Sequence, residues 1–213
     1  MSSKQDPRGQ GRTPEEAHAP EQVLGSFRVS RIPALELGEG KCGEIGGIAA
    51  GLGCERAALI TGAGSYESLP VRESLERGLA NSGVDAHRFP VSGEPSPGTV
   101  DDIVERAKEY GVDCVAAVGG GSVMDTGKAV AAMCRHEGSV EDYLEGVGSQ
   151  KPEGRRLPLL VAPTTAGTGS EATKNAVISR VGRGGFKKSL RHEAFVPDVA
   201  VLDALAAVTV PPE

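Results

Sequence analysis

Residues 119–128 carry the feature of this sequence best suited to chemistry: Gly-Gly-Gly-Ser-Val-Met-Asp-Thr-Gly-Lys, directly after a short apolar run. Gly119, Gly120 and Gly121 let the backbone turn sharply and approach a ligand closely. Ser122 is a suitable N-cap for the helix expected next, whose first-turn N–H groups would face the glycines. Such a turn binds anions, most naturally a pyrophosphate. Its spacing is neither G-x-G-x-x-G nor that of a phosphate loop.

Asp125 and Lys128 follow on the same expected helix, three residues apart and thus one turn from each other. They lie on the face that leads to the glycine turn. Two interpretations remain open: the pair contributes to a site, or it is an exposed ion pair beside a glycine-rich turn.

A second candidate loop covers residues 163–171, Pro-Thr-Thr-Ala-Gly-Thr-Gly-Ser-Glu. Thr164, Thr165 and Thr168 place hydroxyl groups on flexible backbone, which suits contacts with phosphate or ribose hydroxyls. The same composition is typical of a solvent loop. The position of both loops after expected strands favours a site, because parallel sheets bind ligands at the carboxyl ends of their strands.

The elements that position these loops alternate along the chain. Apolar runs typical of buried parallel strands cover residues 57–61, 114–118 and 157–162, and residues 84–91 alternate as a strand does. Helical periodicity appears at residues 41–52, 71–79, 96–111 and from the glycine turn to Cys134. Residues 27–37 are interpreted as a strand or hairpin. The pattern predicts an α/β fold: a Rossmann-like parallel sheet flanked by helices, with a short β-hairpin.

The composition limits the possible domain organisation and the classes of binding partner. Residues 1–22 hold only three apolar side chains (Met1, Ala17 and Ala19). This predicts a disordered tail and leaves residues 23–213 as one domain. The net charge of −6 argues against broad nucleic-acid or membrane-surface binding. No apolar run is long enough to cross a bilayer or to form a secretory h-region.

The four cysteines are Cys42, Cys54, Cys114 and Cys134. Their positions lack the paired spacing of a zinc site or a redox motif. We therefore expect buried free thiols, and with them a cytoplasmic location.

The two loops, in this order and spacing, resemble the iron-containing (group III) alcohol dehydrogenase family. Its relatives include glycerol dehydrogenase, maleylacetate reductase and dehydroquinate synthase. Residues 142–146, 175–178 and 197–203 support the resemblance, which runs from about Val23 to the last residue.

The resemblance implies hydride transfer between C4 of a nicotinamide and an alcohol or aldehyde carbon, with iron polarising the substrate oxygen. It implies that the glycine turn holds the cofactor pyrophosphate, that the threonines lie against the cofactor, and that Asp125 and Lys128 reach the nicotinamide-ribose side. The implied cofactor contacts are thus Gly119, Gly120, Gly121, Ser122, Asp125, Lys128, Thr164, Thr165 and Thr168.

Gly62 bears on the choice between NAD and NADP. NAD users of the family often have an acidic residue here, which binds the ribose 2′-hydroxyl and repels a 2′-phosphate. With glycine at this position, Ser65 and nearby N–H groups have room for the phosphate. We expect tolerance of NADP or a slight preference for it; alternatively, Gly62 only ends a strand.

The family's metal is held by one aspartate and three histidines on an all-helical second half, which is absent from this sequence. The histidines present are His18, His87, His136 and His192. They are scattered and are expected to be surface residues, and Asp198 and Asp203 are not assigned to metal. We therefore expect no metal ligands in this chain and no meaningful turnover from it alone. The end at Glu213 suggests a truncated or split reading frame, or a partial sequence.

Three functions remain open. The first is the cofactor domain of an iron-type alcohol dehydrogenase acting on a small alcohol or aldehyde. The others are a metal-free reductase resembling maleylacetate reductase, and a non-catalytic nucleotide-binding remnant. The resemblance allows a homo-oligomer, because members of the family are often dimers or larger, and it does not identify the substrate.

Overall fold

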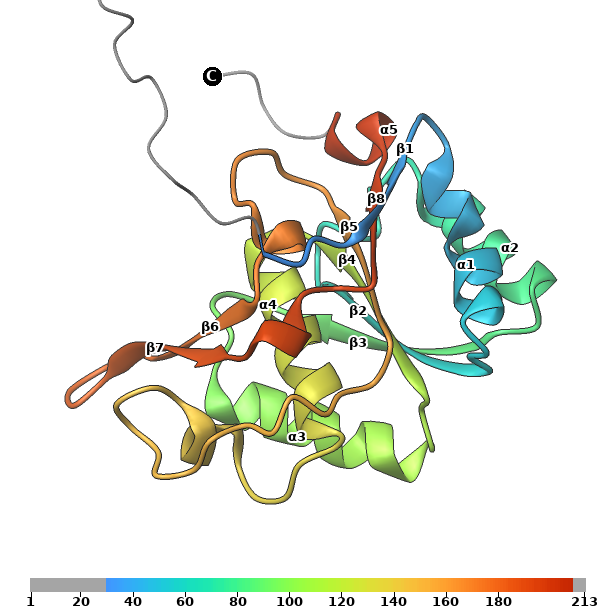
Figure 1. Ribbon diagram of the computed structural model, residues 1–213. Coiled ribbons are helices and arrows are strands. Elements are labelled where there is room, and N and C mark those ends of the chain that lie inside the picture. The colour runs from blue at the N-terminus through green and yellow to red at the C-terminus, as the bar shows by residue number, and fades with distance from the viewer. Residues whose placement is uncertain (1–29, 209–213) are drawn as a thin grey trace, which may run out of the picture. The chain divides into compact units, whose positions relative to one another are not determined.

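Six strands form the central sheet in the computed structural model, which describes residues 30–208 (Figure 1). Their order across the sheet is β1 (Ala34–Leu37), β8 (Val199–Leu202), β5 (Leu159–Pro163), β4 (Cys114–Gly119), β2 (Arg56–Gly62) and β3 (Asp85–Val91). Every pairing in this sheet is parallel. The carboxyl ends of all six strands therefore lie at one edge, and the sequence-based prediction of a parallel α/β sheet is confirmed.

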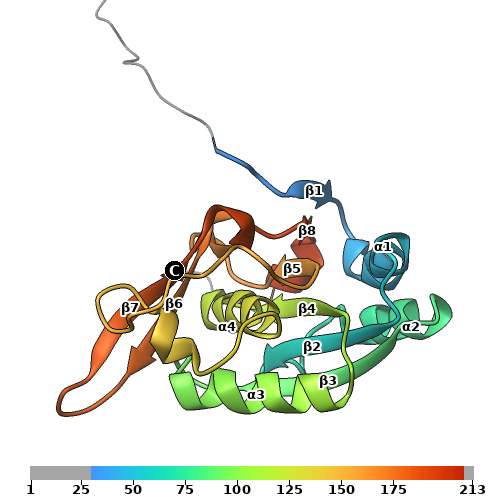
Figure 2. The same cartoon turned by 60° about the horizontal axis from the view of Figure 1, so that its bottom comes forward.

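Helices cover both faces of the sheet (Figure 2). They are α1 (Ile45–Gly51), α2 (Arg72–Asn81), α3 (Pro97–Glu109), α4 (Gly121–Met133) and the short α5 (Ala204–Ala207). Side chains of α1, α2 and α5 pack in one apolar cluster, and those of α3 and α4 pack in the other. Each cluster uses one face of the strands.

The central strand β4 shows why its sequence is apolar throughout. Val115 and Ala117 point into the cluster of α3 and α4, whereas Cys114, Ala116 and Val118 point into the cluster of α1 and α2. Successive side chains of a strand alternate between faces, so a strand covered on both sides has no position for a polar residue.

Helix α4 lies unusually close to β4. A Cβ atom at Gly127 would be 2.5 Å from the Cβ of Ala117. Any larger residue at position 127 would push the helix away from the strand. The glycine thus fixes the distance between α4 and the sheet.

A separate two-stranded antiparallel hairpin is formed by β6 (Asn175–Arg180) and β7 (Phe186–Arg191). The hairpin element of the predicted fold is therefore present, at residues 175–191. Residues 27–37 were interpreted as a strand or hairpin, and the strand is found at Ala34–Leu37, while residues 27–29 lie outside the described residues. It is an edge strand parallel to β8, in register Ala34 with Val199. This pairing joins residues far apart in sequence, so local alternation could not reveal it.

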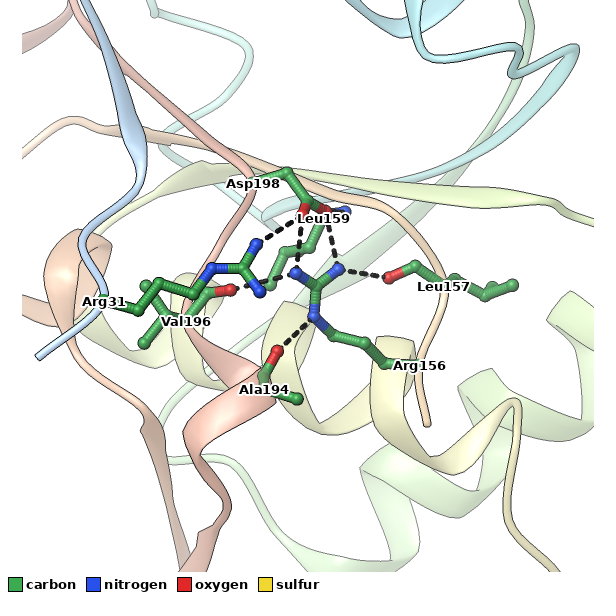
Figure 3. A network of polar contacts seen from close by, with 7 residues as sticks. All are labelled: Arg31, Arg156, Leu157, Leu159, Ala194, Val196 and Asp198. Carbon is green, nitrogen blue, oxygen red and sulfur yellow. Dashed lines mark hydrogen bonds and ion pairs between the residues drawn. The ribbon is translucent and has the colours of Figure 1, made fainter. Parts of the chain in front are cut away.

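Arg156 and Asp198 tie β5 to β8 at the amino edge of the sheet (Figure 3). Two guanidinium nitrogens lie 2.6 and 2.8 Å from the two carboxylate oxygens, and the Leu159 N–H donates to the same carboxylate at 2.9 Å. Arg156 also donates to the backbone carbonyls of Leu157, Ala194 and Val196. Burial alone would raise the pKa of Asp198, but the bonds from Arg156 and Leu159 hold it below its usual value.

Several predictions concern single residues or the ends of the chain. The predicted tail, residues 1–22, and the expected start of regular structure at Val23 lie outside the described residues. All four cysteines are free thiols; Cys42, Cys54 and Cys114 are buried and Cys134 is half-buried. Across residues 30–208, no helix has both the length and the apolar character that a membrane span requires.

Candidate functional site

The neighbouring strands β2 and β4 mark a switch point in the sheet. Helix α2, which follows β2, packs on one face, whereas α4, which follows β4, packs on the other. The strands pair in parallel with Thr61 opposite Val118, so Gly62 and Gly119 end them side by side. Open α/β sheets bind ligands in the crevice at such a point.

The glycine turn runs directly into α4. Gly120 is the N-cap, with φ −76° and ψ −174°, and the helix begins at Gly121. The prediction that Ser122 caps the helix is therefore wrong, because the cap lies two residues earlier, at Gly120, and Ser122 is inside the first turn. The Ser122 carbonyl accepts a hydrogen bond from the Thr126 hydroxyl at 2.8 Å. Since glycine offers no capping side chain, the first-turn N–H groups stay available to a ligand.

The hydroxyl-rich loop, residues 163–171, contacts the glycine turn, residues 119–121. The Thr164 N–H donates to the Gly119 carbonyl at 3.0 Å. A Cβ atom at Gly120 would lie 3.4 Å from Thr165 Oγ1, and one at Gly121 would lie 3.3 Å from Thr168 Cγ2. The two loops thus converge at the carboxyl edge of the sheet, as their positions after strands predicted.

Two buried oxygens of the hydroxyl-rich loop, Thr165 Oγ1 and Glu171 Oε2, have no hydrogen-bond partner among residues 30–208. Of the two, Thr165 is the one that lies against the glycine turn. Buried polar atoms in folded proteins nearly always have a partner. An unpartnered hydroxyl facing a glycine turn is therefore suited to a ligand atom.

Lys128 lies beneath the hydroxyl-rich loop and not on the surface. Its side chain is fully buried, with Nζ 3.0 Å from Asp125 Oδ1. The ammonium donates to the carbonyls of Ser170 at 2.9 Å and Asn175 at 2.7 Å, and to Thr173 Oγ1 at 3.1 Å. Burial lowers the pKa of Lys128, and the nearby Asp125 carboxylate opposes this shift. The interpretation of an exposed ion pair is wrong.

Asp125 bonds to the same segment as Lys128. Its Oδ1 accepts from the Ser170 hydroxyl at 2.6 Å, and its Oδ2 accepts from the Val177 N–H at 3.0 Å. The three donors of Lys128 are used within the protein. This favours a positioning role for the pair over the cofactor contact that the resemblance implied.

The end of β2 carries Gly62 and, in the following turn, Ser65. A Cβ atom at Gly62 would meet Ser65 Oγ, so the serine hydroxyl occupies the space of a side chain at position 62. Arg88 Nε, from β3, donates to Thr61 Oγ1 at 2.9 Å, and its guanidinium lies 4.4 Å from the centre of the Tyr66 ring.

Arg88 was missed from the sequence. It lies 27 residues after Thr61 and reaches this position only because β3 pairs with β2. Glu67 forms ion pairs with both Arg88 and Arg72. The hydrogen bond from Arg88 is the main reason that the pKa of Glu67 is lowered. Arg72 also pairs with Glu76, so the charges of the two arginines beside Ser65 are balanced by two glutamates.

A cavity of about 330 Å³ adjoins the hydroxyl-rich loop at the carboxyl ends of β1, β5 and β8. Thr165, Leu37, Glu171 and Asp203 are among its lining residues. The buried Asp203 carboxylate accepts from the backbone N–H groups of Gly40 at 3.1 Å and Cys42 at 2.9 Å. The cavity was also missed from the sequence, because strands distant in the chain supply its walls.

The expectation that His136 is a surface residue is wrong. It is buried, with Nδ1 2.8 Å from the Ala132 carbonyl and Nε2 accepting from the Glu153 N–H at 3.1 Å. The chain after α4 folds back over the helix end and covers the ring. His87 and His192 are half-buried, and His18 lies outside the described residues.

The described residues do not fit the family's iron ligands of one aspartate and three histidines. Between residues 30 and 208, one group of three metal-ligating side chains has all its donor atoms within 4.8 Å of one another: Cys54, Asp113 and Cys114. This group contains no histidine. It also lies at the amino ends of β2 and β4, opposite the glycine turn.

Comparisons with known proteins agree with this geometry. The family model "Iron-containing alcohol dehydrogenase" matches residues 33–204. Choline dehydrogenase of Bacillus subtilis is 35% identical over 90% of this chain and 48% of its own length.

Two solved structures of similar proteins cover most of the chain. NADH-dependent butanol dehydrogenase A from Thermotoga maritima has a TM-score of 0.80 and 29% identity over 87% of this chain and 46% of its own. Sulfoacetaldehyde reductase from Bifidobacterium kashiwanohense, solved in complex with NAD+, has a TM-score of 0.77 and 31% identity over 88% of this chain and 49% of its own. The chain spans about half the length of these relatives.

Proposed function

Because the chain belongs to the iron-containing alcohol dehydrogenase family, as its nucleotide-binding portion, we propose that it binds NAD(P) for an alcohol dehydrogenase reaction. In that reaction the nicotinamide exchanges a hydride with the carbon of a small alcohol or aldehyde. The convergence of the glycine turn and the hydroxyl-rich loop is the observation that carries the proposal.

The cleft between these loops suits a diphosphate. The first turn of α4 supplies N–H donors and the positive end of the helix dipole. Thr165 and Thr168 supply hydroxyl groups from the opposite side. Gly120 and Gly121 are small enough to leave the space between the loops open. In this proposal Ser122 and Thr164 line the same cleft.

Asp125 and Lys128 act in this proposal by holding the hydroxyl-rich loop in place. Their bonds to Ser170, Thr173, Asn175 and Val177 join the end of that loop to α4. The glycine turn begins the same helix. The pair therefore fixes one wall of the cleft relative to the other.

We propose that the chain accepts NADP as well as NAD. Gly62 places no carboxylate at the adenosine end of the site, and the Ser65 hydroxyl lies where a side chain would be. Arg88 places a guanidinium beside the end of β2, with Nε 2.9 Å from Thr61 Oγ1, and Glu67 and Glu76 balance the charges of Arg88 and Arg72. A hydroxyl and cations favour a 2′-phosphate, whereas an acidic residue at position 62 would repel it.

We propose that this chain alone does not turn over substrate. Its described residues do not match the iron ligands of the family, and no step through iron is assigned to them. Steady oxidation of NADH by an aldehyde in the presence of the purified chain and added iron would contradict this proposal.

The binding proposal is tested by fluorescence titration of the chain with NADH and NADPH. Gly121→Val fills the cleft, because even its Cβ would lie 3.3 Å from Thr168, and we expect affinity to fall tenfold or more, about 1.4 kcal/mol. Gly98→Val is the matched control. It also lies in the first turn of a 13-residue helix, and its Cβ has open space around it. Absence of saturable binding by the unaltered chain would refute the proposal.

The cofactor preference is tested by Gly62→Asp. We expect NADPH affinity to fall about tenfold with NADH affinity retained, because the new carboxylate repels the 2′-phosphate. Ser65→Ala is expected to weaken NADPH binding by a smaller factor than Gly62→Asp does. Equal NADPH affinity of Gly62→Asp and the unaltered chain would show that the phosphate is not bound at this position.

A further inference from the structure

Three side chains capable of binding a metal meet at the amino edge of the sheet. Cys54 immediately precedes the turn into β2, whereas Asp113 and Cys114 lie at the start of β4. The two sulfur atoms and a carboxylate oxygen all lie within 4.8 Å of one another. The nucleotide cleft is at the opposite edge and uses none of these residues.

Parallel pairing of the two strands creates this group. Ala57 of β2 lies opposite Cys114 of β4. The Asp113 carboxylate accepts from the N–H groups of Glu55 at 3.0 Å and Arg56 at 3.0 Å. These bonds fix the carboxylate beside both thiols. Oδ1 accepts from both of these N–H groups, whereas Oδ2 accepts from Glu55 alone and keeps a lone pair for another partner.

The surroundings favour a cation. Cys114 is fully buried and Cys54 is 5% exposed, whereas Asp113 is only half-buried and open to solvent. The Asp113 carboxylate lies beside both thiols and gives this group a negative charge. An incoming divalent cation offsets this charge and converts thiols to thiolates.

We propose that Cys54, Cys114 and Asp113 form a zinc-binding site. Zinc takes thiolate and carboxylate ligands in four-coordinate geometry, and water supplies the fourth ligand. The carboxylate favours zinc over purely thiophilic ions such as Cu(I). Each thiol loses one proton to solvent as two Zn–S bonds and one Zn–O bond form, with no change in oxidation state. Ligand atoms on such bonds lie roughly 3–4 Å apart, so small side-chain rotations close the site.

The bound ion would join the amino ends of β2 and β4. It adds a cross-link between residues about 60 positions apart in the chain. Because zinc binds the folded arrangement and not the separated ligands, it stabilises the folded chain. This proposal is independent of nucleotide binding.

The test uses the full chain, reduced and freed of metal, titrated with Zn²⁺ against a chromophoric chelator. We expect one zinc per chain. Cys54→Ser and Cys114→Ser are expected to weaken binding roughly 100-fold or more, and Asp113→Asn by roughly 10-fold or more. Cys42→Ser and Cys134→Ser are matched controls, because each removes one thiol outside the group, and they should bind as the unaltered chain does. Titration with Co²⁺ should give a thiolate-to-cobalt charge-transfer band.

Two further measurements keep the test decisive if a variant folds poorly. Zn²⁺ should raise the melting temperature of the unaltered chain. In the same chain, mass spectrometry should show that zinc slows the alkylation of Cys54 and Cys114 more than that of Cys42 and Cys134. Equal zinc affinity of Cys54→Ser, Cys114→Ser and the unaltered chain would overturn the proposal, as would zinc that leaves the alkylation of both thiols unchanged. NADH titration of the same samples reports separately on the nucleotide cleft.

Discussion

The two edges of the parallel sheet both carry polar residues, but these residues are partnered differently. At the amino edge, Arg156 and Asp198 bond to each other and to neighbouring backbone groups (Figure 3). At the carboxyl edge, the Thr165 hydroxyl and the first-turn N–H groups of α4 face a cleft. Polar groups that satisfy one another stabilise the fold, whereas polar groups left without partners suit a ligand.

Each edge also contains a buried cation paired with a carboxylate. Arg156–Asp198 joins two strands, whereas Lys128–Asp125 joins a helix to the hydroxyl-rich loop. If the comparison holds, loss of the first pair should affect stability alone. Loss of the second should affect stability and nucleotide binding together.

The largest effect is expected for Arg156→Met. It removes the two-bond partner of Asp198, which keeps only the half-exposed Arg31, and it leaves three backbone carbonyls without this donor. The free energy of unfolding should therefore fall by about 4 kcal/mol. Urea unfolding measures this change. Arg155→Met is the matched control, because Arg155 is exposed and pairs with the exposed Glu153. We expect it to change stability by less than about 1 kcal/mol. The comparison of the two edges would fail if Arg156→Met lost no more stability than Arg155→Met. It would also fail if folded Arg156→Met bound NADH with altered affinity.

Lys128→Met should have the next largest effect. Asp125 keeps its bonds from the Ser170 hydroxyl and the Val177 N–H, so we expect a smaller stability loss of about 3 kcal/mol. The loop released from α4 should weaken NADH binding about tenfold. Lys174→Met is the matched control, because it removes a more exposed ion pair with Glu193 in the same region. We expect it to change neither the stability nor the NADH affinity. Unchanged NADH affinity of folded Lys128→Met would show that the pair does not position the loop.

The smallest effect is expected for the pH dependence of the free energy of unfolding. The pKa of Asp198 is lower in the folded chain than in the unfolded chain, so its contribution is complete above the unfolded value of about 3.9. That contribution is lost as the pH falls through the lower, folded pKa. Urea unfolding between pH 5 and pH 2.5 should therefore show a steeper loss for the unaltered chain than for Asp198→Asn. Equal slopes would contradict the assignment.

The sequence predicted those features that depend on local pattern. The strands at residues 57–61, 114–118 and 157–162 were predicted because both faces are buried and every position except Thr61 is apolar. The convergence of the two loops followed from their places after parallel strands. The start of α4 was misplaced by two residues, since glycines leave no capping side chain to mark it.

Features that depend on pairing between distant segments could not be predicted. Arg88 reaches Thr61, and Cys54 meets Cys114, only through the register of β2 with its neighbours. His136 is buried by a segment that returns after α4. The candidate nucleotide cleft was therefore accessible from sequence, whereas the residues beside Gly62 and the whole amino edge were not.

The close approach of α4 to β4 at Gly127 has a consequence for remote substitutions. Helix and strand are held at one spacing, and the turn between them contains the glycines of the cleft. A methyl group at position 127 would lift the helix and carry its first turn with it. Variation at a residue that never meets the ligand would then tune affinity by shifting the donors, and a search confined to cleft-lining positions would overlook it.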